Sequence, residues 1–268
     1  MYVGSLHIHP LKSAAALDVN ALDIVSRGPV GDRRWLVIDA ADRFLTARAE
    51  SRLVLIRALP QGDGLRLLAP GCAPLEVIKP SGVVRVDVRV WDDQVNAALA
   101  DDGAHVWLSA FLGRPVRLVH MDAASRRMVD PTFGAEGDEV SFADGYPLLV
   151  ISRAALDGLN ARLAQPISMS RFRPNVVVED CAPHAEDSWR RVRIGSVVFD
   201  AVKTCTRCVF TTIDPVTAVR DQAREPLATL GTYRGAGDGV GVLFGMNLIA
   251  RGKGTLRLRD AVEVLEMR

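Results

Sequence analysis

Apolar segments of strand length, separated by turns, occur along most of this chain, and they constrain its fold more than any other feature. From Val84 to Val90, apolar and charged residues alternate strictly, which is typical of a strand with one face in water. Apolar runs of strand length lie at 35–38 and 53–56, and further strand candidates lie at 116–120, 148–151, 175–178, 197–202, 209–213, 242–249 and 262–265. Many short strands with few helices predict a mainly β (α+β) protein built from barrels or paired sheets.

Three short helices are expected among these strands. Asp101 or Asp102 can cap the first helix, and Gly113 can end it in the left-handed conformation. Ser152 precedes an apolar stripe at helical spacing. Pro226 can begin a third helix, since proline is favoured at the first helical position.

The length of 268 residues predicts two domains, which we place at 1–117 and 118–268. The formal net charge of +1 gives no general attraction to nucleic acid or to an anionic membrane. No apolar run reaches the roughly 18 residues that a transmembrane helix needs, and no signal peptide opens the chain. Four cysteines do not make a disulfide scaffold in a chain this long. These features predict a cytoplasmic protein with free thiols and with neither nucleic acid nor membrane as a partner.

The sharpest local motif is the C-x-x-C of Cys205 and Cys208, which Lys203 and Arg207 accompany. A thiolate is a nucleophile and a soft metal ligand, and nearby positive charge favours it. Three interpretations remain open from spacing alone: a redox dithiol, two structural cysteines, or half of a zinc site. The zinc site would take its other ligands from the upstream pair Cys181 and His184.

Basic side chains stand at the ends of several predicted strands. Lys12 and Ser13 follow the first strand, Arg33 precedes the second, Arg48 comes shortly after, and Arg173 precedes a later strand. Arginines in such places suit a phosphate-bearing cofactor, because guanidinium binds phosphate in a bidentate fork. Taken singly, each is more simply a solvated strand end. The sequence has no Walker loop or dinucleotide fingerprint, which argues against the usual kinds of nucleotide binding.

Two further groups of residues have both a functional and a structural interpretation. The turn at 141–147, which contains Asp144, Gly145 and Tyr146, precedes an apolar strand, and it is either part of a site or an ordinary Asp-Gly turn. His7 and His9 alternate on the first strand as two metal ligands would. No carboxylate or cysteine accompanies them, so we interpret the pair as structural.

At these motifs the chain resembles the MOSC proteins, which carry the C-terminal domain of molybdenum cofactor sulfurase. Within them it is most similar to the mitochondrial amidoxime-reducing component and its bacterial relatives. The resemblance spans the whole chain in order, in segments 9–13, 31–38, 45–48, 141–147, 171–175, 186–189, 205–215 and 244–247. It implies an N-terminal MOSC-associated β-barrel domain packed on a MOSC β-barrel domain with a few short helices.

The resemblance also implies roles for individual residues. Cys208 matches the cysteine whose thiolate binds molybdenum, and Cys205 matches a second cysteine that is not the metal ligand. Asp144 matches a catalytic loop near the metal. The residues that match the binding positions for the molybdenum cofactor (molybdopterin) are Lys12, Ser13, Arg33, Arg48, Gly145, Tyr146, Arg173 and Asn175.

The implied function is the reduction of small N-hydroxylated compounds at molybdenum. Some bacterial relatives carry a ferredoxin-like domain with four cysteines, but no cysteine follows Cys208 here. Electrons are therefore expected from a separate protein of ferredoxin or flavin reductase type. The alternative is a carrier of sulfur or of molybdenum cofactor, with Cys208 as a persulfide or a metal-holding thiol. Sulfurase-type members are normally fused to a pyridoxal-phosphate domain, so pyridoxal phosphate is an expectation for the family alone.

Overall fold

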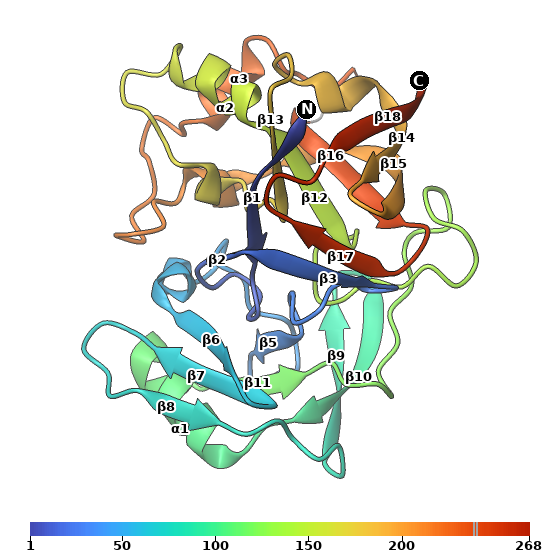
Figure 1. Cartoon of the computed structure of the whole chain (residues 1–268). Helices are drawn as coiled ribbons and strands as arrows, with labels where there is room; N and C mark the ends of the chain where they lie inside the picture. The colour runs from blue at the N-terminus through green and yellow to red at the C-terminus, as the bar shows by residue number, and fades with distance from the viewer. Residues whose placement is uncertain (238, 240) are drawn as a thin grey trace.

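The computed structural model describes residues 1–237, 239 and 241–268, and its strands form an upper and a lower part (Figure 1). The upper part is built on an eight-stranded sheet. In spatial order the strands are β18 (Val262–Met267), β14 (Trp189–Ile194), β15 (Val197–Arg207), β16 (Val242–Ala250), β12 (Leu148–Ser152), β13 (Val176–Glu179), β1 (Tyr2–Ile8) and β2 (Leu17–Val19). Neighbours in this sheet are antiparallel, apart from the parallel pair β12 and β13.

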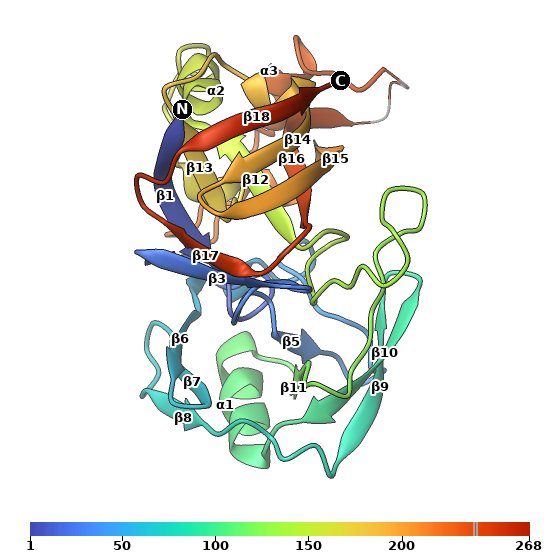
Figure 2. The ribbon, with the colours of Figure 1, turned by 45° about the vertical axis from the view of Figure 1, so that its right-hand side comes forward.

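Three smaller sheets complete the fold. One contains β5 (Trp35–Ile38), β11 (Arg117–His120), β10 (Asp93–Leu99) and β9 (Arg85–Val90). Another contains β6 (Arg57–Gln61), β7 (Gly64–Leu68) and β8 (Leu75–Val77). The third joins β17 (Gly254–Arg257) to β3 (Ala21–Val25) and β4 (Gly28–Pro29) and lies between the two parts (Figure 2). The expectation of a mainly β fold is confirmed.

The two parts interlock because the first strands of the chain pair with strands from its second half. In β1, Tyr2 lies opposite Glu179 and Leu6 lies opposite Val176 of β13. The next hairpin contributes β3, whose Ile24 lies opposite Gly254 near the other end of the chain. Backbone hydrogen bonds therefore tie the ends of the sequence together across the middle of the molecule.

The helices begin and end close to the predicted residues. The first, α1 (Asp102–Leu112), is capped by Asp101, whose carboxylate accepts a hydrogen bond of 2.9 Å from the Ala104 backbone N–H, and Gly113 follows it with φ of 65°. The others are α2 (Arg153–Asn160) after Ser152 and α3 (Leu227–Gly231) after Pro226. None of the helices in the described part of the chain has the length and apolar character needed to span a bilayer.

Two predicted strands were wrong. Leu53–Ile56 is part of a 3-10 helix at Ser51–Leu55, and Val209–Ile213 is part of another at Val209–Thr212. In the second, the Thr211 and Thr212 hydroxyls donate to the carbonyls of Cys208 and Val209, which favours a tight turn over a strand. Short apolar runs do not distinguish a strand from a buried helical turn.

The boundary between the two parts differs in one respect from the expected one. The sequence places the boundary between residues 117 and 118, inside β11, but the whole of this strand pairs with β5 and β10 in the sheet of the first part. The chain then runs as a long loop from 121 to 147 before it enters β12. This loop passes along the junction between the parts, where it contributes to the site described below.

Gly245 allows β12 and β16 to approach closely. Its φ is +87°, and a Cβ atom there would lie 2.7 Å from Ile151 Cγ1 and 2.9 Å from the Val150 carbonyl oxygen. We expect Gly245→Ala to lower the free energy of unfolding by about 2–4 kcal/mol, from left-handed strain and overpacking together. Urea unfolding measures this change. Gly252→Ala, which meets no atom within 4 Å, is the control and should change stability little; equal effects would contradict the explanation.

Candidate active site

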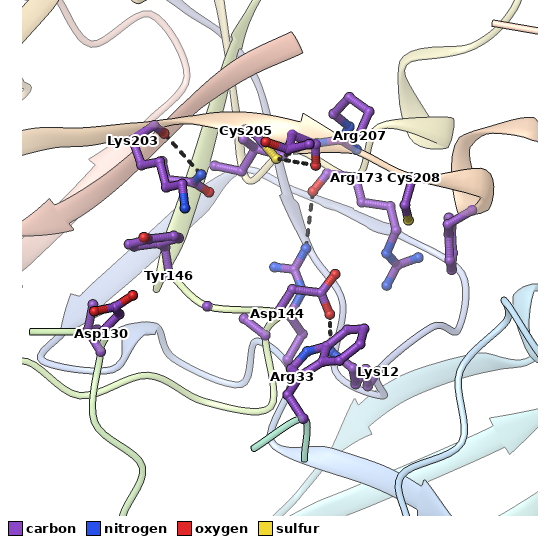
Figure 3. Close-up of a pocket in the computed structure, with 18 of the residues that line it drawn as sticks. Lys12, Arg33, Asp130, Asp144, Tyr146, Arg173, Lys203, Cys205, Arg207 and Cys208 are labelled. Carbon is purple, nitrogen blue, oxygen red and sulfur yellow. Dashed lines mark hydrogen bonds and ion pairs between the residues drawn. The ribbon is translucent and has the colours of Figure 1, made fainter. Parts of the chain in front are cut away.

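A cavity of about 810 Å³ lies between the two parts, and all ten residues predicted for the site line it (Figure 3). Lys12, Ser13, Arg33 and Arg48 come from loops beside β1 and β5. Asp144, Gly145 and Tyr146 come from the long loop before β12. Arg173, Asn175 and Cys208 come from the segments that precede β13 and follow β15. Residues far apart in sequence thus meet at one place.

The two cysteines of the C-x-x-C motif have different positions and different partners. Cys205 lies within β15, and its sulfur accepts a hydrogen bond of 2.9 Å from Arg207 Nη1. Cys208 comes immediately after the strand, and its sulfur accepts a hydrogen bond of 3.1 Å from Arg48 Nε. A guanidinium contact stabilises a thiolate, so each sulfur has its own cation. The geometry gives Cys208 a partner from the opposite part of the protein.

Asp144 links two cations on the cavity wall. Its Oδ1 accepts a hydrogen bond of 2.6 Å from Lys12 Nζ, and its Oδ2 accepts one of 2.9 Å from Arg48 Nη2. Enclosure by protein raises the pKa of this carboxyl, but Lys12 and Arg48 outweigh that effect and hold the pKa well below its usual range. The side chain remains 60% exposed because it faces the cavity. Asp144 is therefore ionised, and it also orients the arginine that contacts Cys208.

Lys12 is a buried lysine whose charge is finely balanced. Its Nζ donates to the Phe142 carbonyl and to Asp144, both at 2.6 Å. Burial lowers the pKa of Lys12 to about 8, even though Asp144 opposes the shift. Its ammonium group consequently loses its proton only slightly above neutral pH.

Arg33 and Arg173 form a second cationic group, and Asn175 supports it. Arg33 pairs with the buried carboxylate of Asp32 and donates to the Arg173 carbonyl at 3.1 Å. The amide of Asn175 is fully buried: its oxygen accepts from the Leu149 N–H and from Arg33, and its nitrogen donates to the His7 carbonyl. Because protein groups engage both ends of this amide, Asn175 acts here by positioning Arg33.

Arg173 has one guanidinium nitrogen that donates no hydrogen bond to any described residue, so it could donate to an anion. Its Nη1 donates to the Ala14 carbonyl at 2.5 Å, while its buried Nη2 has no hydrogen-bond partner within the described chain. Burial, and then the charge of Arg33, lower the pKa of Arg173 to about 9. An unpartnered buried donor is costly. An anion in the cavity would remove this cost.

Four residues that line the cavity have a strained backbone. Ser13, Arg33, Trp91 and Arg173 all have positive φ angles, of 68°, 50°, 56° and 57°. Each non-glycine residue in this region costs about 1–3 kcal/mol, and such residues gather at functional sites. Here the strained backbones direct basic side chains, and the ring under Arg48, toward one space.

Tyr146 forms the wall of the cavity farther from Cys208 (Figure 3). Its ring meets that of Phe133 edge to face at 6.1 Å, and Lys203 Nζ lies 4.4 Å from the Phe133 ring centre. Burial, and then the charge of Asp130, raise the pKa of Tyr146 to about 12, so its hydroxyl stays protonated. Gly145, beside it, would meet no atom within 4 Å of an added Cβ, so its neighbourhood is open. This end of the cavity combines aromatic surface with hydrogen-bonding groups.

Sequence reasoning missed several residues of the cavity. Arg127 is 5% exposed, and its guanidinium donates to the carbonyls of Ser141, Ala143 and Asp144. It therefore holds the loop that presents Asp144. Trp91 lies under Arg48 at 4.5 Å and steadies its guanidinium. In the sequence, the only signal for Arg127 is the Arg126-Arg127 doublet, and no signal indicates a role for Trp91.

The four residues of the zinc alternative do not come together. Within residues 1–237, 239 and 241–268, no three histidine, cysteine or acidic side chains are grouped as metal ligands. Cys181 packs against the core of the eight-stranded sheet, where burial raises the pKa of its thiol to about 11. The His184 ring meets Phe244 edge to face at 5.4 Å. His9 is also structural: it is fully buried beside Asp32.

The charges that line the cavity identify the kind of molecule that it fits. Seven basic and four acidic side chains line it, so the basic ones are in excess. Together with the unpartnered Nη2 of Arg173, this excess suits an anionic group of cofactor size. Both Cys205 and Cys208 line the cavity, and Cys208, which Arg48 contacts, can supply one soft ligand to a metal. The residues present therefore fit a phosphate-bearing metal cofactor.

Comparisons with known proteins agree with this arrangement. A family model described as the MOSC N-terminal beta barrel domain matches residues 1–115, and the MOSC domain matches residues 137–263. Mitochondrial amidoxime-reducing component 1 of Mus musculus is 36% identical over 280 residues, which cover 98% of this chain and 82% of the mouse protein. The protein of the same name from Danio rerio is 37% identical over 243 residues, which cover 87% of this chain and 74% of the Danio rerio protein. The protein of the same name from Homo sapiens is 33% identical over 280 residues, which cover 98% of this chain and 82% of the human protein.

Proposed function

Because the chain belongs to the family of proteins that join a MOSC N-terminal β-barrel domain to a MOSC domain, we propose that it is a molybdenum-cofactor-dependent reductase of N-hydroxylated compounds. The relatives named amidoxime-reducing components match almost the whole chain at 33–37% identity. The observation that carries the proposal is the cation-lined cavity with Cys208 at its wall, hydrogen-bonded by Arg48.

In this proposal each part of the cavity has a separate role. Cys208 holds the metal through its thiolate, while Arg33 and Arg173 hold the anionic part of the cofactor by charge-assisted hydrogen bonds. Lys12 and Arg48 are fixed by Asp144, so they keep their positions when the cavity fills. When bound, the cofactor supplies two-electron redox chemistry, which the protein orients.

The remaining residues bind the substrate and exclude bulk water. The space beside Tyr146 and Gly145 admits a small organic molecule next to the cofactor position, with Met128 and Val129 on its wall. The Tyr146 hydroxyl remains a donor throughout the neutral range, since its pKa is raised to about 12. It can therefore donate a hydrogen bond to the oxygen of an N–O group.

Metal and pterin analysis tests this proposal directly. Protein made in a host that synthesises the cofactor should contain about one molybdenum and one pterin per chain. It should also reduce an amidoxime or a hydroxylamine when a chemical reductant is supplied. Stoichiometric zinc without molybdenum would contradict the assignment.

The balanced charge of Lys12 predicts a pH dependence of cofactor uptake. Its pKa of about 8 means that the cationic form dominates at pH 7 and is mostly lost at pH 9. Uptake of molybdenum cofactor by cofactor-free protein should therefore weaken by roughly tenfold over this range, as one charged contact is lost. Equilibrium binding followed by pterin fluorescence measures it.

Lys12→Met is the matched variant, because methionine has an unbranched side chain of similar length and carries no charge. Its uptake should be weak at pH 7 and should fall only about twofold up to pH 9, the loss expected from Arg173 with its pKa of about 9. A variant with the full pH dependence of the native protein would show that another group titrates.

A further inference from the structure

A second cavity, of about 670 Å³, shares no lining residue with the first. It lies beside the start of β5, the end of β11, the turn between β6 and β7, and the segment that follows β3. Neighbouring residues in the chain serve the two cavities, since Arg33 lines the first and Arg34 lines the second. Nothing in the proposed reductase activity uses Arg34.

The basic side chains of the second cavity differ in whether they are paired. Arg27 is fully engaged: it pairs with Glu139 and donates to the carbonyls of Asp122 and Ser125. Asp122 in turn is held by Arg85, which is not part of the cavity wall, at 2.6 Å. By contrast, the side chains of Arg34 and Lys79 make no hydrogen bond or ion pair with any residue that the structure describes.

The remaining charges of this cavity leave an excess of basic groups. Glu139, which pairs with Arg27, also pairs with Arg126: Arg126 Nε lies 3.3 Å from Glu139 Oε1, and the Arg126 side chain is 61% exposed. Asp63, in the turn between β6 and β7, is the acid on the wall that has no described ion-pair partner. Arg34 and Lys79 therefore face the cavity without a direct ion pair to any described residue, although the charges of Asp32 and Glu139 act on Arg34 from a distance.

The polar groups at this second cavity are energetically unfavourable as they stand. Arg34 is half-buried, and burial, followed by repulsion from Arg27, lowers its pKa to about 10. His120 is 7% exposed, and its enclosed Nδ1 has no partner among the described residues. Burial, and then the charge of Lys79, lower the pKa of His120 to about 4, so the ring is neutral and adds no further charge. The nitrogen atoms of Arg34 are not enclosed in this way, so its guanidinium is open to the cavity.

Much of the remaining wall is apolar. Pro10, Trp35 and Leu65 are buried behind it, whereas Val25, Val30 and Pro60 are partly or largely exposed. The Trp35 ring lies 4.6 Å from that of His120. Val30 is 54% exposed at this wall. An inorganic anion would satisfy the basic groups but would leave this surface in water. A ligand with an apolar body would cover it.

We propose that this second cavity binds a small organic carboxylate, whose carboxylate group pairs with Arg34 and Lys79 and whose apolar body packs against Val30 and Pro60. The guanidinium of Arg34 offers a fork for two carboxylate oxygens, and Lys79 adds a point charge. This site is independent of the reductase activity and of the cofactor.

Calorimetric titration with benzoate tests the proposal on the whole chain without any need for activity. Benzoate should bind, whereas benzamide, its uncharged analogue of the same shape, should not. Arg34→Gln should weaken benzoate binding roughly ten- to hundredfold, the range expected for the loss of a charge-assisted pair. Lys79→Gln should weaken it less, because its side chain is exposed and flexible.

Two control variants separate this site from general charge effects and from the first cavity. Arg190→Gln and Lys253→Gln remove the same charges from distant exposed positions, and benzoate binding should be unchanged.

The thermal stability of Arg34→Gln gives an independent measurement. Burial and repulsion from Arg27 both disfavour the charge of Arg34, so this variant should melt at or above the temperature of the native protein. Benzoate should raise the melting temperature of the native protein but not that of Arg34→Gln.

Three results would overturn the proposal. Benzoate binding that survives Arg34→Gln would place the anion in the first cavity. Equal binding of benzamide would show that charge is not recognised. Inorganic phosphate that binds through Arg34 while benzoate does not would show a site for inorganic anions only.

Discussion

Replacing Cys208 by serine is expected to abolish reductase turnover and to remove most of the molybdenum. A serine hydroxyl is a hard, weakly acidic ligand and does not replace a soft thiolate. Loss of a group that only hydrogen-bonds to a metal ligand costs roughly 10–100-fold in metal affinity or activity, so loss of the ligand itself should cost more. Metal content and turnover of the purified variant, with reduced viologen as the donor, measure the effect.

Cys205→Ser is the matched control for this experiment. The Cys205 sulfur also contacts a guanidinium, but that of Arg207 and not that of Arg48. Substantial metal and activity should therefore remain in this variant. Equal losses from both substitutions would point to a paired role for the two cysteines and would sink the assignment of Cys208 as the ligand.

The second large effect concerns the electron donor, because each reduction of an N–O bond consumes two electrons. The common ferredoxin centre needs four clustered cysteines, and only Cys205 and Cys208 are close in this sequence. We therefore expect the loaded protein to be active with reduced viologen and inactive with reduced nicotinamide alone. Activity with nicotinamide should appear when a reductase and a small electron carrier are added.

The outcomes of this experiment discriminate between the functions considered. The donor protein should approach the cavity near Arg33, Arg173 and Cys208, since electron transfer requires short distances. Strong activity with reduced nicotinamide and no partner would refute a separate donor. Inactivity of fully loaded protein with every donor would favour a carrier of sulfur or cofactor over a reductase.

The sequence predicts the β-rich fold well where a local pattern determines the structure. The strict alternation at 84–90 became β9, and the Asp101 cap and Gly113 bound α1 as expected. It fails where the pattern is ambiguous: the apolar runs at 53–56 and 209–213 are 3-10 turns. It also missed β10, in which the small residues at 96–98 give no clear alternation.

The candidate site could be predicted from chemistry-bearing motifs, but its internal supports could not. Cys208, Arg48 and Asp144 each stand in a recognisable segment, and the structure brings them into one hydrogen-bonded group. Arg127 acts through the carbonyl groups of a loop, and Trp91 acts through its ring face. Such contacts depend on tertiary structure and leave no periodic signal in the sequence.

The pairing of β1 with β13 bears on how the protein is made. Tyr2 leaves the ribosome well before Glu179, which lies opposite it, and at about 5–20 residues per second the delay is roughly 10–35 s. During this time the first strand can pair only with the short β2, and the wall formed by Arg173 and Cys208 does not yet exist. A nascent chain therefore cannot enclose the cofactor until nearly all of it has been translated. Cofactor insertion would in this way be reserved for completed polypeptides, and truncated translation products would not sequester molybdenum.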